Sequence, residues 1–330
     1  MFDFSLIVPI FNRPEEADEL LKSLAEQSRK NFELVLVEDG STMPSSEIVD
    51  KYIGQLSIKY ITKSNTGRSD TRNVGMEHAS GNYFVFFDSD CIIPSGYFET
   101  LEEYLENDYA DCFGGPDNAH ESFSDIQKAI NYAMTSFWTT GGIRGGKINM
   151  EKFVPRTFNM GFSREVYAKV GGFKNMFGED IDLSMRIREA GFSTKLFRSA
   201  FVYHKRRVSL KKFYKQVNIF GIARINLYKL YPQSLKLVHA LPAAFTLGSL
   251  LLLILSLYSP YFLLPFAFFT LLLFFDSLIR NKSAGIALLS VIACYIQLYG
   301  YGTGFIKSFV EKIILRKGLE DIETLKRIYK

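Results

Sequence analysis

The chain has 330 residues, of which 47% are hydrophobic and 15% aromatic, and this supply of apolar side chains excludes a predominantly disordered protein. The net charge of +4 conceals an acidic part, residues 1–189 with 19 Lys/Arg against 30 Asp/Glu, and a basic part, residues 190–330 with 20 against 5. The three cysteines are scattered and odd in number, so they argue against a disulfide framework and for a reducing compartment.

Strands and helices alternate through the first 110 residues. Apolar runs predict strands at Phe4–Ile10, Phe32–Val37, Ile58–Ile61 and Tyr83–Phe87. Helical patterns follow each of them, at Pro14–Gln27, Ser45–Ile53, Ser69–Ala79 and Ser95–Glu106. Strands that are apolar nearly throughout and are separated by helices indicate a mostly parallel sheet covered on both faces. The sequence therefore predicts an α/β domain that binds ligands beyond the carboxyl ends of its strands.

The pattern is weaker after residue 110. A Gly-rich segment at 141–146 precedes a predicted strand at Thr157–Phe162, and a helix is expected between Gly178 and Gly191. The segment Leu210–Tyr228 then carries apolar residues at helical spacing among basic ones, namely Lys211, Lys212, Lys215 and Arg224. A basic amphipathic helix of this kind can lie in a membrane interface or pack on the domain as a surface helix.

A long apolar run follows. Leu237–Phe275 contains no charged residue apart from the titratable His239. At about 1.5 Å per helical residue, the run is long enough to cross a roughly 30 Å hydrocarbon core twice. With a turn at Ser259-Pro260, we expect membrane helices at 237–258 and 260–280 rather than a buried soluble hairpin.

A third uncharged run, 284–306, is less secure as a membrane span because it contains Gln297, Gly300, Gly302 and Gly304. Basic residues flank the first two spans, which places both flanks in the cytoplasm: Lys205, Arg206, Arg207, Lys211, Lys212, Lys215, Lys229 and Lys236 come before them, and Arg280 and Lys282 after them. The tail, 307–330, is basic and amphipathic as well, which conflicts with a third full crossing. The third run is therefore either re-entrant or interfacial, or it departs from the rule.

The charge distribution also predicts the location of the chain. A basic part that contains long apolar runs indicates contact with lipid rather than nucleic acid. The first twenty residues carry Arg13 and four acidic residues after only a short apolar stretch, so they do not indicate a secretory signal peptide. We expect a multi-pass protein of the cell (inner) membrane with its catalytic domain in the cytoplasm.

The strand Tyr83–Phe87 is followed by two carboxylates, Asp88 and Asp90, that are separated by one small residue. At the end of a buried strand, these oxygens can bind a hard divalent cation, Mg²⁺ or Mn²⁺, which in turn can bridge the diphosphate of a nucleotide-sugar. A lone Asp-x-Asp is also compatible with a turn or a helix cap. Its position after a fourth parallel strand favours the metal site.

A second acidic pair, Glu179-Asp180, opens the helix expected after Gly178. A carboxylate there can cap the helix or complement its dipole. It can equally act as a general base that takes the proton of an acceptor hydroxyl. Only the combination with the metal motif favours the second interpretation.

Residues 4 to about 207 resemble the family-2 glycosyltransferases, which have the GT-A fold. The resemblance is carried by the motifs Val8-Pro9-Ile10-Phe11-Asn12-Arg13, Val37-Glu38-Asp39-Gly40-Ser41, Asn65-Thr66-Gly67, Arg72-Asn73-Val74-Gly75, Phe87-Asp88-Ser89-Asp90, Asn159-Met160-Gly161-Phe162, Gly171-Gly172-Phe173 and Gly178-Glu179-Asp180-Ile181-Asp182-Leu183. The chain departs from the processive synthases of that family, because it lacks their Gln-x-x-Arg-Trp motif: Val217-Asn218-Ile219 follow Gln216.

The resemblance implies a role for each matching position. Pro9, Asn12, Asp39, Arg72 and Asp88 would bind the nucleotide-sugar, which is a UDP- or GDP-sugar. Three side chains would serve the metal: Asp88, Asp90 and His204. The resemblance makes Asp180 the catalytic base of an inverting single displacement.

The resulting expectation is a Rossmann-like GT-A domain at 1–207, an amphipathic interface helix and linker at 208–236, a membrane region at 237–306 and the basic tail. Such a protein would move a sugar to a lipid or lipid-linked acceptor. Two alternatives are a nucleotidyltransferase and a non-catalytic membrane protein that binds sugar nucleotides. The first would carry a Gly-rich basic loop after its first strand, where this chain has Pro9-Ile10-Phe11-Asn12-Arg13-Pro14. The second would have no need of acidic residues at the site.

Overall fold

The structure is a computed structural model that describes residues 2–118, 120, 123–140, 154–205 and 207–319. The Gly-rich segment 141–146, Arg206 and residues 320–330 of the basic tail lie outside the described residues. The chain forms two compact units. The sheet unit takes its described residues from Met1–His120 and Met150–His204, and the helical unit takes its own from Glu121–Asn149 and Lys205–Leu319.

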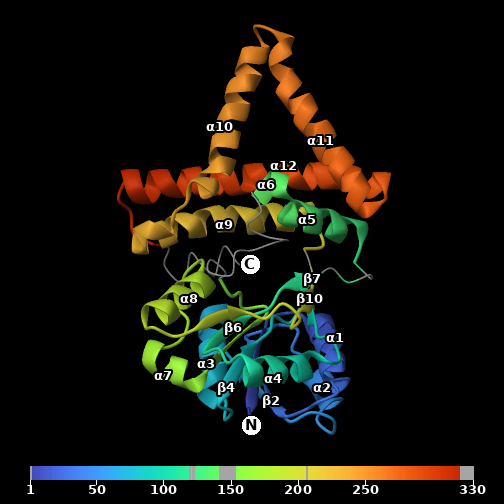
Figure 1. The fold of residues 1–330 in the computed structure, drawn as a ribbon, viewed down its shortest axis with the longest axis vertical. Helices are drawn as coiled ribbons and strands as arrows, with labels where there is room; N and C mark the ends of the chain where they lie inside the picture. Colours follow the sequence, from blue (N-terminus) through green and yellow to red (C-terminus); the bar gives the residue numbers. More distant parts are fainter. Residues whose placement is uncertain (1, 119, 121–122, 141–153, 206, 320–330) are drawn as a thin grey trace. The chain divides into compact units, whose positions relative to one another are not determined.

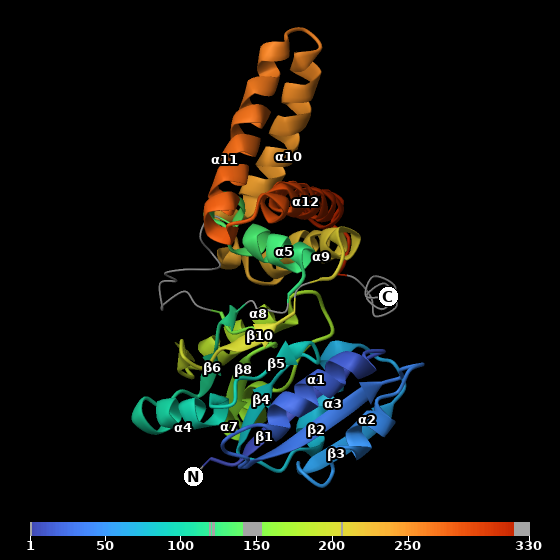
Figure 2. The same cartoon turned by 90° about the vertical axis from the view of Figure 1, so that its right-hand side faces the viewer.

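The sheet unit is built on a seven-stranded sheet in the order β3-β2-β1-β4-β8-β6-β9 (Figure 2). Its strands are β1 (Phe4–Ile10), β2 (Phe32–Asp39), β3 (Ile58–Lys63), β4 (Tyr83–Phe86), β6 (Cys112–Gly114), β8 (Met160–Ser163) and β9 (Thr194–Leu196). The first four pair in parallel, and β8 is antiparallel to both of its neighbours, β4 and β6. The prediction of a mostly parallel α/β sheet is confirmed.

Both faces of the sheet are buried, as the nearly continuous apolar strands predict. Alternate residues of β1 enter opposite cores: Leu6 and Val8 pack with α1 and α4, whereas Ile7 packs with α3 and α8. The helices of this unit are α1 (Pro14–Ala25), α2 (Ser46–Asp50), α3 (Arg68–His78), α4 (Tyr97–Asn107), α7 (Arg164–Val170) and α8 (Glu179–Glu189). They lie within a few residues of the predicted ranges where a helix was predicted.

A second, small sheet stands next to the end of β4. It has the order β5-β10-β7, with β5 at Cys91–Ile92, β7 at Asp117–Asn118 and β10 at Val202–His204. The strand β10 runs antiparallel to β5, and the pairing sets His204 opposite Cys91. Strands this short have no hydrophobic period, so sequence patterns do not reveal them. This sheet nevertheless brings a residue from position 204 beside the Asp88–Asp90 motif.

The helical unit contains α5 (Asp125–Thr135), α6 (Phe137–Thr140), α9 (Leu210–Leu230), α10 (Leu237–Ser256), α11 (Leu264–Asn281) and α12 (Ala284–Phe309). Short 3₁₀ turns at Pro232–Ser234 and Pro260–Leu263 precede α10 and α11, and a π-helical turn at Val310–Ile314 follows α12. Because α5 and α6 group with the later helices, the boundary between the units does not coincide with a single cut after residue 207.

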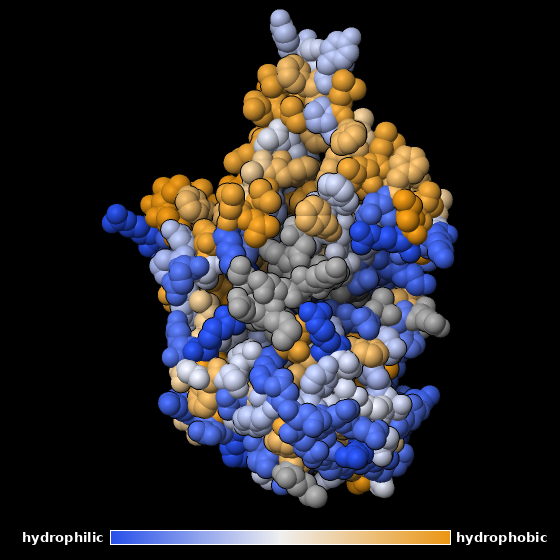
Figure 3. Space-filling view, in the orientation of Figure 1, coloured by the Kyte–Doolittle hydropathy of each residue, from blue (hydrophilic) through white to orange (hydrophobic). Residues whose placement is uncertain are grey.

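Three helices of this unit are long and apolar enough, by length and composition, to cross a membrane: Leu237–Ser256, Pro260–Asn281 and Ala284–Ile314. In Figure 1, α10 and α11 form a hairpin, and α12 runs crosswise beneath it. Figure 3 shows hydrophobic side chains gathered over the surface of this hairpin and of α12. The expected C-terminal apolar helices are therefore present.

Candidate active site

The predicted site residues gather at the carboxyl edge of the main sheet, because parallel strands end at the same edge. Asn12 follows β1, Asp39 ends β2, and Asp88 and Asp90 follow β4. Arg72 reaches this edge from α3, where its NH2 donates a hydrogen bond to Asp88 Oδ1 over 2.6 Å. The structure thus brings together residues that are up to 78 positions apart in the chain.

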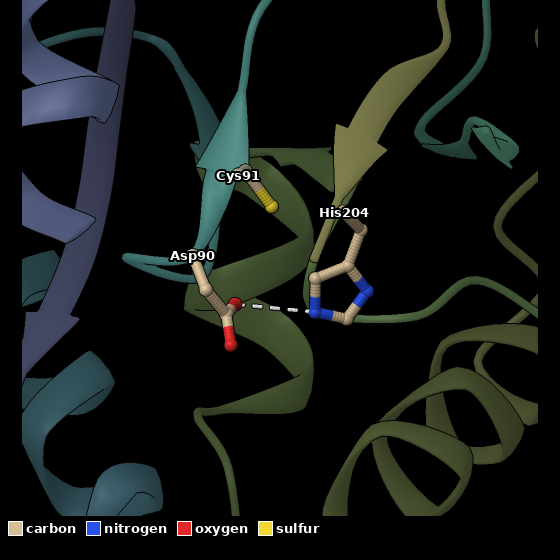
Figure 4. Close-up of side chains that lie close together, drawn as sticks. All are labelled: Asp90, Cys91 and His204. Carbon is tan, nitrogen blue, oxygen red and sulfur yellow. Dashed lines mark ion pairs between the residues drawn. The ribbon is translucent and has the colours of Figure 1, made fainter. Parts of the chain in front are cut away.

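Asp88, Asp90 and His204 converge on one point at this edge. His204 Nε2 lies 3.2 Å from Asp90 Oδ1 and 4.0 Å from Asp88 Oδ2. Figure 4 shows the Asp90 carboxylate, just before β5, and the His204 imidazole, at the end of the neighbouring strand β10, facing each other. The other oxygen of Asp90, Oδ2, accepts a hydrogen bond of 2.6 Å from Arg13 NH1. Two carboxylates and an imidazole are a donor set that suits Mg²⁺ or Mn²⁺.

Cys91 lies in the same cluster, since its sulfur and the ligand atoms of Asp90 and His204 are all within 4.8 Å of one another. Complete burial, together with the neighbouring carboxylates, raises the pKa of this thiol well above its ordinary value. A thiol that stays protonated at neutral pH is a poor ligand, and a soft one for these hard cations. The oxygen and nitrogen atoms around Cys91 are the better donors.

His204 has a strongly shifted pKa. Burial alone would lower the pKa of the imidazole, but Asp90, Asp117 and Asp88 raise it to about 9. The Nδ1 atom lies 3.8 Å from Asp117 Oδ2, in β7 of the same small sheet. Three carboxylates around one imidazole mark this point as a site that attracts positive charge. A proton or a metal cation can supply that charge, because a cation competes with protons for the same atoms.

The first turn of α8 is tied to this cluster through Arg72. The buried guanidinium of Arg72 contacts Asp88 on one side and Glu179 Oε1, 3.4 Å from its NH1, on the other. Arg68 Nε also reaches Glu179 Oε1, over 2.7 Å. Since Glu179 is only 1% exposed, both arginines serve to hold α8 at the edge of the sheet.

The three carboxylates of that turn have different surroundings. Glu179 is enclosed by its two arginines, and Asp182 is buried between Lys174 and Arg186. The Asp180 side chain is 16% exposed, and its Oδ2 accepts one hydrogen bond of 3.2 Å from Arg156 NH1. Burial alone would raise the pKa of Asp180, but the charges of Arg156 and Arg68 outweigh burial and lower it. Asp180 is therefore ionised at neutral pH and has access to solvent.

Asp180 makes one contact of the kind that stabilises the start of a helix. The N-cap position of α8 is Gly178, in a left-handed conformation with φ 86°, which has no side chain to cap the helix. Asp180 Oδ1 accepts a hydrogen bond of 2.8 Å from the backbone N–H of the next residue, Ile181. This is one local contact, and the other oxygen points to Arg156 instead of the helix end.

Asp39 binds the loop that leads into α3. Its Oδ1 accepts hydrogen bonds from Lys63 Nζ (2.7 Å) and Thr66 N (2.9 Å), and its Oδ2 accepts them from Gly67 N (3.0 Å) and Asn65 Nδ2 (3.2 Å). The residue is 4% exposed. In this structure Asp39 therefore shapes the loop beside the predicted nucleotide pocket, with both of its oxygens held by the chain itself.

Asn12 has a similar role at the end of β1. Its φ of 52° lies in the left-handed region, which asparagine tolerates better than most residues. The Oδ1 atom accepts hydrogen bonds from the backbone N–H groups of Thr42 (2.7 Å) and Met43 (3.1 Å), in the loop after β2. Pro9 lies in β1 opposite Val37 of β2 and is partly exposed.

Sequence reasoning assigned no role to several partners of these residues. Arg13 was part of a quoted motif, but its contact with Asp90 spans 77 positions. The other partners are Lys63 of Asp39, Asp117 of His204, Arg156 of Asp180, and Arg68 of the Arg72 network; Glu179 was considered only as a cap or base, not as a partner of Arg72. The sequence shows charged residues near the ends of strands and helices, and this was the only sign of such partners. Which charges pair over such long separations cannot be predicted without the fold.

Relatives of the chain are known. The family model described as Glycosyl transferase family 2 matches residues 5–171. The glycosyltransferase GlyA of Streptococcus pneumoniae is 40% identical over 112 residues, which are 34% of this chain and 16% of that protein. The cholesterol galactosyltransferase of Borreliella burgdorferi is 33% identical over 111 residues, 33% of this chain and 31% of that protein. The match thus spans only a small part, between 15% and 17%, of the first four relatives.

A solved structure resembles nearly the whole chain. The mannosyltransferase PcManGT from Pyrobaculum calidifontis, in complex with GDP-Man and Mn²⁺, aligns with a TM-score of 0.65 over 94% of this chain and 88% of that one. Its sequence identity is 15%, so the likeness concerns the fold. It agrees with the GT-A fold predicted from the sequence. Since the family model covers residues 5–171, half of the chain, the protein belongs to glycosyl transferase family 2.

Proposed function

We propose that the protein is a membrane-bound, metal-dependent and inverting glycosyltransferase. It transfers a sugar from a UDP- or GDP-sugar to a lipid or lipid-linked acceptor at the cytoplasmic face of the membrane. The proposal rests mainly on one observation at the carboxyl edge of the main sheet. The cluster of Asp88, Asp90 and His204 is connected, through ion pairs of Arg72 with Asp88 and Glu179, to the first turn of α8, which contains Asp180.

The nucleotide-sugar is proposed to bind along the carboxyl edge of β1, β2 and β4. Asn12 and Asp39 shape the two loops there through hydrogen bonds to their backbone N–H groups. The relation to PcManGT, whose structure contains GDP-Man, supports a nucleotide-sugar as the donor. Long-chain processive synthesis is not part of the proposal, because the chain lacks the Gln-x-x-Arg-Trp motif.

The residues present fit a divalent metal. Asp88, Asp90 and His204 would hold it, and the presence of Mn²⁺ in PcManGT supports a cation of that kind. Such a cation neutralises negative charge on the diphosphate as the nucleoside diphosphate leaves. Arg72 and Arg13 balance the charge of Asp88 and Asp90, which would otherwise repel each other.

Asp180 is proposed to be the catalytic base. The acceptor oxygen forms a bond to the anomeric carbon while the bond from that carbon to the diphosphate oxygen breaks, and the acceptor's proton moves to Asp180. Arg156 keeps Asp180 ionised and therefore ready to accept a proton. Attack on the face opposite to the leaving group inverts the anomeric centre.

The acceptor is proposed to be a membrane lipid or a lipid-linked molecule. The apolar helices α10 and α11 support membrane attachment, and one relative bears the name cholesterol galactosyltransferase. The basic residues that flank these helices, among them Lys229, Lys236 and Lys282, support a cytoplasmic position for both flanks. We therefore propose that the protein resides in the cell (inner) membrane.

The proposal is tested by incubating membranes that contain the protein with a panel of UDP- and GDP-sugars and Mn²⁺, followed by mass spectrometry of the lipid fraction. We expect one donor to yield a glycosylated lipid, and we expect a chelator to prevent its formation. Binding of a nucleotide-sugar without turnover on any acceptor would instead favour the non-catalytic alternative. Transfer of a nucleotidyl group would favour a nucleotidyltransferase.

A further inference from the structure

The third apolar helix, α12, lies lengthwise against α9 in both views of the helical unit (Figures 1 and 2). From this packing we infer that α12 does not cross the membrane. Together with α9 it forms an interfacial pair, α9 and α12, that lies along the cytoplasmic surface of the bilayer, and only α10 and α11 enter deeply. The inference rests on the membrane attachment in the proposed function, but not on the reaction.

Close backbone contacts join the interfacial pair over several turns. A Cβ atom on Gly304 would lie 2.2 Å from Asn218 O, and one on Gly221 would lie 2.2 Å from Tyr301 O. Asn218 Nδ2 also donates a hydrogen bond of 3.0 Å to Gly300 O. Two of the glycines that weaken α12 as a predicted span, Gly300 and Gly304, are therefore positions where α9 approaches it, and the third, Gly302, is where Pro242 of α10 approaches it.

The contact extends beyond these glycines in both directions. Toward the start of α12, Ala293 and Cys294 pack in one apolar cluster with Phe213 and Val217 of α9. Past its end, the buried Lys312 donates a hydrogen bond to Asn226 of α9. Since the two helices run side by side over this length, they must have the same orientation to the bilayer.

The charge of α9 decides what that orientation is. This helix has 21 residues, and five of them are basic: Lys211, Lys212, Lys215, Arg224 and Lys229. Cations spread along a helix are strongly disfavoured in the hydrocarbon core, whereas a basic amphipathic helix is stable at a surface of anionic lipid. If α12 spanned the bilayer, these cations would be carried into it. An orientation along the surface leaves them at the headgroups.

Helix α5 leads to the same conclusion. It packs against both α9 and α12, but its 11 residues make it far too short to cross a membrane. The Tyr132 hydroxyl of α5 donates a hydrogen bond of 2.6 Å to Asp276 Oδ2, near the end of α11. Polar contact at this end of the hairpin fits a position near the headgroups.

The hairpin of α10 and α11 is more exposed than α12, as expected for helices that are surrounded by lipid. Within their most apolar windows, 22% of α10 residues and 11% of α11 residues are buried, against 44% for α12. Exposed apolar side chains such as Leu250, Leu251 and Phe268 give the hairpin a surface that suits lipid chains (Figure 3). The hydropathy of α12 is explained in part by its burial between α9, α5 and the hairpin.

This arrangement resolves the conflict over charge in the tail. Lys307 lies in the last turn of α12, and Lys312, Arg316 and Lys317 follow the helix. A third crossing would place these residues on the side opposite to the other basic flanks. With α12 along the surface, the start and the end of this helix lie on the same, cytoplasmic side.

Cysteine labelling tests the inference on the full chain in sealed membrane vesicles of known orientation. Three single substitutions each place a thiol at an exposed position: Ala284→Cys at the first residue of α12, Lys317→Cys after its end, and Tyr258→Cys at the tip of the hairpin. The native Cys91, Cys112 and Cys294 are buried, so the unsubstituted protein is the blank. A membrane-impermeant maleimide should label positions 284 and 317 from the same face and position 258 from the other.

Each outcome has one meaning. Labelling of positions 284 and 317 from opposite faces would overturn the inference, because α12 would then cross the bilayer. Labelling of position 258 from the same face as both others would keep α12 at the surface and refute the two-span hairpin of the proposed function instead.

A second measurement uses no substitution. Trp138, the only tryptophan of the chain, is 43% exposed in α6, which packs against α12. In vesicles of brominated lipids, we expect its fluorescence to be quenched more strongly by bromine near the headgroups than by bromine near the chain ends. Stronger quenching by the deep bromines would place α6 and α12 in the bilayer core and contradict the interfacial pair.

Discussion

At the residue scale, the surroundings of each charge assign its role. Glu179, Asp180 and Asp182 are nearly adjacent in the sequence, and composition alone gives no reason to choose among them. The fold separates them, because Glu179 and Asp182 are buried in ion pairs and Asp180 is the carboxylate with solvent access. This contrast supports the proposal that Asp180, and not its neighbours, is the base.

The exchange Asp180→Asn should lower sugar transfer by about 10²–10⁴-fold, the usual loss when a general base is removed. An amide cannot accept the proton, whereas the nucleotide would still be held by the loops around Asn12 and Asp39. Donor affinity, measured by calorimetry with a non-transferable analogue, should change little. Near-normal transfer would show that Asp180 is not the base.

Asp182→Asn is the matched control, since it removes a carboxylate from the same helical turn. Asp182 is fully buried and pairs with Lys174 (3.0 Å) and Arg186 (2.8 Å). Breaking a fully buried ion pair typically costs about 3–5 kcal/mol of unfolding free energy, and the loss here should be smaller because solvent still reaches Lys174 and Arg186. We expect this variant to lower the midpoint of thermal unfolding, while Asp180→Asn does so far less. A stable Asp182→Asn variant with lost transfer would move the catalytic role to Asp182.

The metal site gives a second prediction for single residues. Loss of a residue that only hydrogen-bonds to a metal ligand typically weakens metal binding by about 10–100-fold. Asp90→Asn removes a proposed ligand itself and should weaken Mn²⁺ binding at least as much. Cys91→Ala is the control at the neighbouring position, and it should leave Mn²⁺ affinity unchanged because the thiol remains protonated. Equilibrium dialysis of both variants measures this directly. Equal affinity in Asp90→Asn and in the unsubstituted protein would remove Asp90 from the metal site.

At the element scale, the sequence predicts those helices and strands that are long enough to show a repeating pattern of hydrophobic residues. The strands β1 to β4 and their helices were predicted within a few residues, because most of them bury an apolar run or one apolar face. The exceptions are α3, whose buried residues are mostly polar or small, and the partly exposed edge strand β3. The strands β5, β7 and β10 have two or three residues each, too few to show a period. Their absence from the prediction matters for the site, since the pairing of β10 with β5 is what places His204 beside Asp90.

The loop between β3 and α3 supplies a prediction at this scale. Each oxygen of the Asp39 carboxylate accepts a bond from a backbone N–H of the loop, at Thr66 or Gly67. In Asp39→Asn, the NH₂ group must face one of these N–H groups in either orientation. A buried group that loses its partner costs about 1–3 kcal/mol. We expect the stability and the nucleotide affinity of this variant to fall together.

Lys63→Met helps to distinguish two roles of Asp39: shaping the loop, and contacting the nucleotide directly. It removes the Lys63 partner of Asp39 and leaves both backbone hydrogen bonds in place. Because the buried Asp39 carboxylate loses its cationic partner, thermal stability should fall at least as far as in Asp39→Asn, whereas nucleotide affinity should fall less, since the backbone hydrogen bonds that shape the loop remain. If Asp39→Asn lost nucleotide affinity at unchanged stability, Asp39 would contact the nucleotide itself, as the family resemblance implies.

At the scale of the whole molecule, the apolar helices were predictable and their grouping was not. A run without charge identifies α10 and α11, but nothing in the pattern of Asp125–Thr135 shows that α5 joins these helices in one unit. That grouping depends on apolar contacts such as those of Ile130 and Ala133 with Phe213 and Leu273. Residues this far apart in the chain meet only through the tertiary fold.

Membrane attachment gives the last prediction. Leu237–Ser256 and Pro260–Asn281 should keep the chain in the membrane through a carbonate wash, because high pH strips electrostatic contacts but leaves buried apolar surface in place. The double variant Leu251→Arg with Phe268→Arg puts one cation on each hairpin helix, at about 2.5–3.5 kcal/mol each on an insertion scale, and should be partly released. Tyr258→Arg adds a cation at the 92% exposed tip and should remain bound. The measurement is the protein fraction in the pellet after washing. Release of the unsubstituted chain would contradict the hairpin, and equal retention of both variants would show that attachment does not depend on burying these helices in lipid.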